Sequence, residues 1–314
     1  MRVAILDSGL DYTHPDLAGR VDLAASRSLQ PFDDAMLQLR FPGAHPIADL
    51  HRHGTHVGAT VTSNGVVAAG VTSRVTLVGI KVCSAFGGCP FSLAVQGMLY
   101  AADLGVDVAN LSFGQNLLRP DMADRDGRST VAIINQTFAY AHRKGVTVVV
   151  AAGNSSIDID HDGNGVKFYC NVPTVICVSA TGPTATGGFG GPWENVDAPA
   201  PYTNFGRSAI SVAAPGGSFA ANATQVSASC SRFSLRFPAC RATPQTLLLA
   251  GTSMAAAVVS GSAALLVEDV GRDPARVRAR LLNTADDLGA PGTDPFYGRG
   301  RITMQNRCAA GTRA

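Results

Sequence analysis

The chain has 314 residues, of which 46% are hydrophobic and only 15% are charged, and its formal net charge is +2. This length allows one large domain or two ordinary ones. The balanced charge gives no electrostatic reason to expect a nucleic-acid partner. No apolar run approaches the roughly 18 residues that cross a membrane, so we expect no membrane partner either.

Short apolar runs alternate with longer periodic stretches along the chain. The runs predict buried strands at residues 3–6, 75–80, 106–111, 146–151, 175–180 and 210–212. The periodic stretches predict helices at residues 53–63, 92–104, 130–144, 253–270 and 273–284. This alternation predicts an α/β fold, with a mostly parallel sheet covered by helices on both faces. No change of composition divides the chain, so we expect one domain over residues 1–314, with irregular segments at 182–201 and 216–246.

Six of the seven cysteines fall in close pairs. The pairs are Cys83 with Cys89, Cys170 with Cys177, and Cys230 with Cys240. This spacing is typical of small disulfide loops in an exported protein, although buried free thiols would give the same pattern. Cys308 has no partner. No signal peptide precedes the first apolar run, so we expect a secreted protein whose N-terminus has been removed.

Ser253 lies where a short Gly-Thr turn meets the predicted helix 253–270. The N-terminus of a helix presents unpaired backbone N–H groups, which favour the negative charge of an acyl-transfer intermediate. A nucleophilic serine would suit this place. The commoner alternative is a hydroxyl that only caps the helix.

Polar residues at other strand and helix ends could complete such a site. Asp7 and Asn154 follow two predicted strands, at the sheet edge where ligands gather in parallel α/β folds. His53 and His56 open the predicted helix 53–63. A nucleophile, a base, an orienting acid and an oxyanion donor would together perform acyl transfer. The residue types alone leave the base open between the two histidines.

Four blocks resemble those of the subtilisin-like serine peptidases. They are DSG from Asp7, HGTHV from His53, AAGN from Ala151 and GTSMA from Gly251. Their order, Asp then His then Ser, is the order known for subtilisin. The resemblance runs from residue 3 to about residue 302, and it implies a three-layer fold and hydrolysis of peptide bonds.

The resemblance also assigns roles to residues. It implies Ser253 as nucleophile, His53 rather than His56 as general base, Asp7 as the residue that orients the base, and Asn154 as oxyanion donor. The substrate peptide would bind along two segments, formed by Leu111, Ser112, Phe113 and Gly114 and by Ala151, Ala152 and Gly153. The implied partners are polypeptide substrates and the chain's own propeptide. The protein would be a monomer that requires no cofactor.

Two features depart from the family pattern. Ala257 and Val258 stand where the family usually has Pro and His, and only six residues precede Asp7. The chain is therefore expected to lack the signal, the propeptide and the N-terminal segment of the family. The alternative function is that of a truncated or inactive fragment, which binds peptides without cleaving them.

A short acidic segment could hold calcium. Asp158, Asp160 and Asp162 alternate before Gly163, as in an EF-hand loop, but Tyr169 stands where a bidentate glutamate would be needed. A weak calcium site and a solvated acidic loop both remain open. Many members of the family hold calcium after the histidine helix with help from the residue matching Asp16. The corresponding loop here looks too short for that.

Overall fold

The computed structural model describes residues 1–114, 116–118, 125–161, 165–167 and 169–304. Asp162 and Cys308, which the sequence singled out, lie outside these ranges. Seven parallel strands form the main sheet, in the order β11-β8-β6-β4-β1-β3-β2. They are β1 (Arg2–Asp7), β2 (Arg27–Ser28), β3 (Thr76–Lys81), β4 (Val108–Leu111), β6 (Thr147–Ala151), β8 (Ile176–Thr181) and β11 (Val212–Pro215).

The strand order reverses at β1. After β1 the chain adds β3 on one side of it and then β4 on the other, and both pairings are parallel. The carboxyl end of β1 is therefore a switch point, where open α/β sheets bind ligands. Asp7 is the last residue of β1 and therefore lies at this point.

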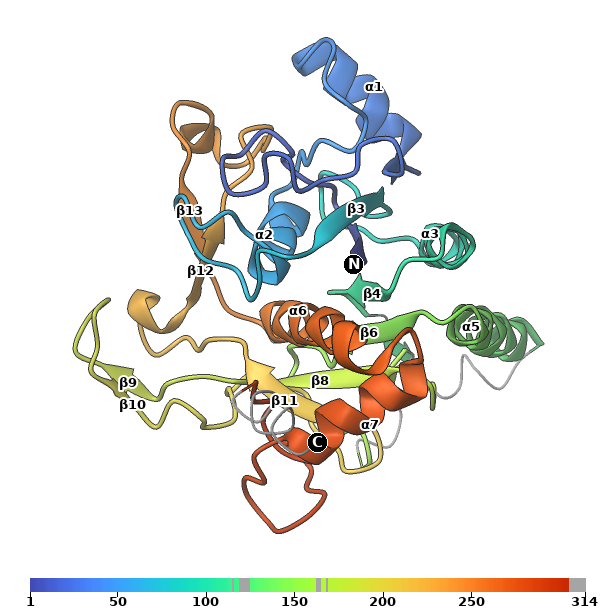
Figure 1. Cartoon of the computed structure of the whole chain (residues 1–314), viewed down its shortest axis with the longest axis vertical. Helices are drawn as coiled ribbons and strands as arrows, with labels where there is room; N and C mark the ends of the chain where they lie inside the picture. The colour runs from blue at the N-terminus through green and yellow to red at the C-terminus, as the bar shows by residue number, and fades with distance from the viewer. Residues whose placement is uncertain (115, 119–124, 162–164, 168, 305–314) are drawn as a thin grey trace.

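Alternate residues of each strand face opposite layers of helices. Val3 and Ile5 of β1 pack in one core with α2 (His53–Val61), α6 (Thr252–Val270) and α7 (Pro274–Thr284). Ala4 and Leu6 pack in the other core with α3 (Phe91–Leu104) and α5 (Arg125–Arg143). Figure 1 shows α3 and α5 together on one side of the strands and α2 and α6 on the other. The predicted three-layer α/β fold is confirmed.

All six predicted strands and all five predicted helices are present, with boundaries shifted by a few residues. The expected strand 210–212 begins only at Val212, and α5 begins five residues earlier than expected. The sequence did not predict α1 (Pro31–Arg40), β2 or three small two-stranded antiparallel sheets. Strands of two to four residues carry almost no periodic signal. The small sheets pair β5 (Asn116–Leu118) with β7 (Gly165–Lys167), β9 (Ala185–Thr186) with β10 (Trp193–Glu194), and β12 (Val226–Ser229) with β13 (Thr246–Leu249).

Helix α6 corrects one expectation. By length and composition it is the one helix among the described residues that could cross a membrane, although the sequence reading found no run of that length. Serines lie between the alanines of this helix, so its apolar stretch is not continuous in the sequence. In the fold, 72% of its apolar window is buried, so α6 serves as the central core helix. Ala257 is fully buried there and Val258 is partly buried, so both replacements of the family residues fit the packing.

The three expected disulfides are confirmed. Cys83–Cys89 closes the loop between β3 and α3, Cys170–Cys177 ties the segment before β8 to that strand, and Cys230–Cys240 closes the connection between β12 and β13. Each bridge is local in sequence, so each stabilises a loop rather than joining distant parts of the fold.

Candidate active site

Asp7 and His53 form a close pair at the switch point. His53 is the first residue of α2, and its Nδ1 lies 2.8 Å from Oδ1 and 2.9 Å from Oδ2 of Asp7. The carboxylate is only 1% exposed, and its Oδ1 also accepts the backbone N–H of Ser8. Burial alone would lower the pKa of His53, but the charge and hydrogen bond of Asp7 outweigh it and raise that pKa overall. Asp7 thus fixes the orientation of the ring and favours its protonated form.

The buried carboxylate of Asp49 holds the first turn of α2. Its Oδ1 accepts the backbone N–H groups of His51 and Arg52, and its Oδ2 accepts both the N–H and the hydroxyl of Thr55. Arg52 has a φ of 135°, a conformation that favours glycine, directly before His53. Asp49 therefore accepts one N–H group of the first turn of α2 and two from the residues directly before it, which helps to hold the strained Arg52 in place.

Ser8 connects this helix start to β1. Its hydroxyl donates to Asp49 at 2.9 Å and accepts the N–H of Gly54 at 3.0 Å. The strand end that carries Asp7 and the helix that carries His53 are therefore joined by buried hydrogen bonds. Sequence reasoning gave no role to Asp49. An acidic residue four positions before a helix start was the available signal.

His56 lies away from Asp7. Its Nε2 is 3.1 Å from the carbonyl oxygens of Val226 in β12 and Leu247 in β13, and its side chain is fully buried. Burial lowers the pKa of His56 to about 4, so the ring is neutral near pH 7. Of the two histidines left open by the sequence, only His53 contacts Asp7. His56 links α2 to the β12–β13 hairpin.

Ser253 lies in the first turn of α6 and is 8% exposed. Its hydroxyl donates to the carbonyl oxygen of Ser112 at 2.8 Å, and the hydroxyl of Ser112 donates to the carbonyl oxygen of Ser253 at 2.9 Å. In the described part of the chain, Ser253 has no hydrogen bond with His53. A cavity of about 210 Å³ is lined by His53 and by Ser112, which is the hydrogen-bond partner of Ser253.

A buried polar chain fixes β4 against α6. The side-chain amide of Asn110 donates to the Ser112 hydroxyl at 2.9 Å, and its oxygen accepts from the Ser260 hydroxyl at 2.9 Å. Asn110 and Ser260 are both fully buried. Asn110 lies inside β4, where it joins the strand to the helix that begins beside Ser253.

The side chain of Asn154 is oriented by Thr252. The amide oxygen of Asn154 is 2.9 Å from both the backbone N and the Oγ1 of Thr252. A backbone N–H can only donate, so the accepting atom is the oxygen, and the NH₂ group is left for another acceptor. A Cβ added at Gly251 would stand 3.1 Å from that nitrogen. Thr252 belongs to the GTSMA block, but the sequence gave it no role.

The two expected substrate segments lie beside each other. A Cβ on Gly114 would stand 3.9 Å from the carbonyl oxygen of Ala151. The backbone of Ala152 is already engaged, since its N–H donates to Val178 and its carbonyl accepts from Asn204. The N–H of Gly153 likewise donates to the Thr252 hydroxyl at 3.0 Å. Ala152 can therefore form a wall for a peptide, but not its hydrogen-bond partner.

Leu111 and Phe113 differ in exposure although they are two residues apart. Leu111 is fully buried in the core beside α3 and α5, whereas Phe113 is partly exposed and lines the same cavity as His53. The ring of Phe113 packs edge-on against Tyr169 at 6.2 Å. Phe113 is therefore, with Ser112, a residue of this segment that can contact a ligand in the cavity.

Two of the expected calcium ligands, Asp158 and Asp160, accept hydrogen bonds from protein groups. Asp158 accepts the N–H groups of Asp160 and His161 and pairs with the His161 ring at 2.9 Å. Asp160 accepts the N–H and the hydroxyl of Ser208. Within the described ranges, no three His, Cys, Asp or Glu side chains cluster as metal ligands. The calcium site remains a prediction.

Asp16 has a different structural role. Its two carboxylate oxygens accept the backbone N–H groups of Val66, Val67 and Ala68 and the hydroxyl of Ser229. Burial tends to raise the pKa of Asp16, but these hydrogen bonds lower it overall. Asp16 thus fixes the loop after α2 directly, through backbone N–H groups.

This three-layer fold, with an Asp–His pair at its switch point and a serine at the start of its central helix, is of the class found in serine peptidases. The sequence model of the subtilase family matches residues 1–300, and the chain belongs to that family. Family membership makes it a serine-type endopeptidase, a hydrolase.

Individual relatives agree with this assignment. The chain is 29% identical over 308 residues to thermitase of Thermoactinomyces vulgaris, covering 96% of this chain and 86% of thermitase. It is also 29% identical to the thermophilic serine proteinase of Bacillus sp. strain AK1, of whose length it spans 60%. Among solved structures, the epidermin leader peptide processing protease of Staphylococcus aureus gives a TM-score of 0.81 at 21% identity, covering all of this chain and 76% of that one. A lanthipeptide protease gives 0.76 at 24% identity, covering 96% of this chain and 85% of its own.

Proposed function

We propose that this chain hydrolyses peptide bonds through a triad of Asp7, His53 and Ser253 and an acyl-enzyme intermediate. The observation that carries the proposal is the pair of short contacts between Nδ1 of His53 and the buried carboxylate of Asp7. A carboxylate in this position keeps the proton on Nδ1 and leaves Nε2 free to act as a base.

The first step requires a rotation of the Ser253 side chain. Its hydroxyl turns from the carbonyl of Ser112 toward Nε2 of His53, which takes the proton as Oγ attacks the peptide carbonyl. Catalytic hydrogen bonds are often absent without substrate and form in the complex. The amide NH₂ of Asn154 and the backbone N–H of Ser253 stabilise the resulting oxyanion. Such a donor typically lowers the activation barrier by about 3–4 kcal/mol.

The second half of the reaction reuses the same groups. Protonated His53 gives its proton to the leaving amine, which departs with the C-terminal part of the substrate. Water then enters, His53 takes one of its protons, and attack on the ester releases the acyl product and restores Ser253. Asp7 stays ionised throughout and stabilises the transient charge on the ring.

The substrates would be polypeptides, bound as an added strand along Ser112 to Gly114 with Phe113 facing a substrate side chain. The three disulfides support secretion into an oxidising environment. We further propose that residues 1–314 act as one domain and as a monomer, with no required cofactor. A propeptide in the precursor would be a further partner.

Labelling by a fluorophosphonate probe tests the proposal. Such a probe phosphonylates an activated serine, so the folded protein should be labelled, and Ser253→Ala should abolish the label. Ser262→Ala is the matched control, because this serine is also buried in α6 but, among the described residues, its hydroxyl bonds only to the carbonyl of Val258. A protein that folds but takes no label would contradict the proposal and favour the inactive, peptide-binding alternative.

A further inference from the structure

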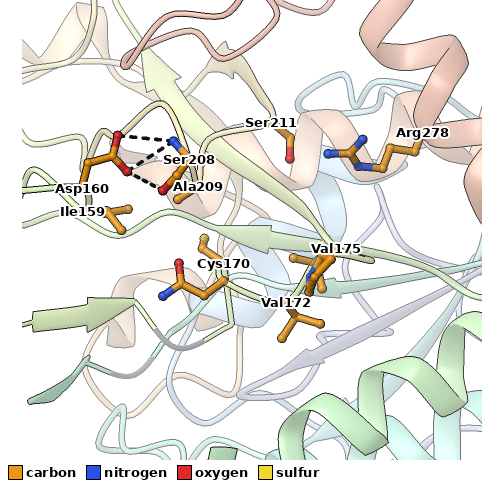
Figure 2. Close-up of a pocket in the computed structure, with 11 residues that line it drawn as sticks. Ile159, Asp160, Cys170, Val172, Val175, Ser208, Ala209, Ser211 and Arg278 are labelled. Atoms are coloured by element: carbon orange, nitrogen blue, oxygen red, sulfur yellow. Dashed lines mark hydrogen bonds between the residues drawn. The ribbon is translucent and has the colours of Figure 1, made fainter. Parts of the chain in front are cut away.

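A second cavity, of about 650 Å³, contains none of the proposed catalytic residues. It lies between the segment before β8, the loop before β11 and helix α7, and Figure 2 shows its lining. Ile159, Val172 and Val175 give it apolar walls. Its volume falls in the range of small-molecule sites, about 300–1,000 Å³.

Arg278 of α7 provides this cavity with a positive charge. In Figure 2 its guanidinium group points from the helix toward Ser211. Among the described residues Arg278 has no ion pair or hydrogen bond, and its Nε is buried without a partner. Arg301, which is similarly shielded, instead pairs with Asp197 and Asp286. A partly buried guanidinium without an acceptor is costly, so its presence needs a reason.

Ser211 adds a second donor beside Arg278. It is 7% exposed, and its oxygen accepts the N–H of Cys177 at 3.2 Å. Within the described ranges its hydroxyl hydrogen has no acceptor. At the other end of the cavity, Asp160 is held by Ser208, so the negative charge stands apart from the guanidinium. At this end of the cavity, the guanidinium of Arg278 and the hydroxyl of Ser211 can both donate to a ligand.

We propose that this cavity binds the carboxylate of a small organic ligand with a short apolar group. Arg278 would hold the carboxylate through its planar fork of N–H groups, and Ser211 would donate a further hydrogen bond. The apolar group would lie against Ile159, Val172 and Val175. A divalent cation does not suit this end, because the unpaired guanidinium would repel it. The proposal does not depend on the peptidase activity.

N-acetyl-leucine and N-acetyl-leucinamide form a matched pair of probes, which differ only in the carboxylate. In calorimetric titrations at low salt, the acid should bind and the amide should bind at least about tenfold more weakly, since charge-assisted bonds to the carboxylate are lost. Arg278→Gln should weaken binding of the acid by a similar factor. Arg276→Gln is the control, because it removes the same charge from the exposed face of the same helix.

Equal binding of the acid and the amide would overturn the proposal. So would a Kd for the acid that is the same in Arg278→Gln and Arg276→Gln, since the acid would then occupy another site, such as the catalytic cleft. If Arg278→Gln does not fold, Arg278→Lys keeps the charge without the planar fork. This variant should weaken the binding of the acid several-fold and leave the binding of the amide unchanged. Unchanged binding of the acid would refute the site.

Discussion

Ser112 and Ser253 are joined by two reciprocal hydrogen bonds, in which each hydroxyl donates to the backbone carbonyl of the other residue at 2.8–2.9 Å. The end of β4 and the start of α6 are thereby held together at the proposed nucleophile. Ser112, expected from the family resemblance as part of the substrate segment, therefore also acts as a positioning residue for Ser253.

Replacing Ser112 by Ala should lower both stability and turnover. The change leaves the amide of Asn110 and the carbonyl of Ser253 without this buried partner, which costs about 1–3 kcal/mol in the free energy of unfolding. Turnover should fall with little change in KM, because the α6 start loses one of its anchors. Urea unfolding and peptide-cleavage kinetics measure the two effects. Ser262→Ala should change neither by a comparable amount, and equal losses in both variants would refute a specific role for Ser112.

Gly251→Ala should reduce kcat by displacing the amide of Asn154. The added Cβ would stand 3.1 Å from Nδ2 of Asn154, so the proposed oxyanion donor must shift by a few tenths of an ångström. Gly251 has an extended backbone, φ 165°, so alanine brings no backbone strain. We expect a loss of about tenfold in kcat or more, up to the 10²–10³ known for removing such a donor.

A double-mutant cycle isolates this contact. In an Asn154→Ala background, Gly251→Ala should have almost no further effect on kcat, because the displaced group is already absent. Additive losses in the double variant would instead place the effect of Gly251 elsewhere in the site.

His56 should make the fold sensitive to acid. Its pKa falls from 6.5 to about 4 on folding, so the unfolded chain binds this proton more readily than the folded one between these values. Stability from this group is complete above about pH 6.5 and is lost as the pH falls toward 4, by about 3 kcal/mol. The pH dependence of stability that comes from His53 has the opposite sign, because folding raises the pKa of this residue. Its contribution is present below pH 6.5 and is lost as the pH rises through the raised value.

Unfolding free energies of the wild type and His56→Gln, measured from pH 7 to pH 4, separate the two histidines. The variant keeps His53, so the difference in slope reports His56 alone. The variant should be less stable at pH 7, because it lacks the imidazole contacts with Val226 and Leu247. Its free energy of unfolding should also fall less than that of the wild type as the pH is lowered. Parallel pH curves for the two proteins would show that His56 is not kept neutral by the fold.

Removal of calcium should leave the melting temperature unchanged. The carboxylates of Asp16, Asp158 and Asp160 all accept hydrogen bonds from protein groups, so none needs a cation to be satisfied. Dialysis against EDTA followed by thermal unfolding tests this, with magnesium added back as a control for ionic strength. A fall of several degrees that calcium alone reverses would establish a site.

The fold class and the residues of the proposed site could be predicted from the amino-acid sequence alone. Long apolar strands alternating with amphipathic helices predict a covered parallel sheet whatever the details of packing, because both faces must be buried. The four motif blocks pointed to Asp7, His53, Asn154 and Ser253. The cysteine pairs, only six to ten residues apart, could be matched because short loops have few alternatives.

The contacts between side chains of distant segments could not be predicted from the sequence. His53 and His56 are three residues apart on one helix, and nothing local shows that one contacts Asp7, 46 residues away, while the other contacts the β12–β13 hairpin. The orientation of the Asn154 amide depends on Thr252, 98 residues later. The bonds between Ser112 and Ser253 span 141 residues. Hydrogen bonds between the ends of distant elements leave no periodic trace in the sequence, because each depends on how whole layers pack against each other.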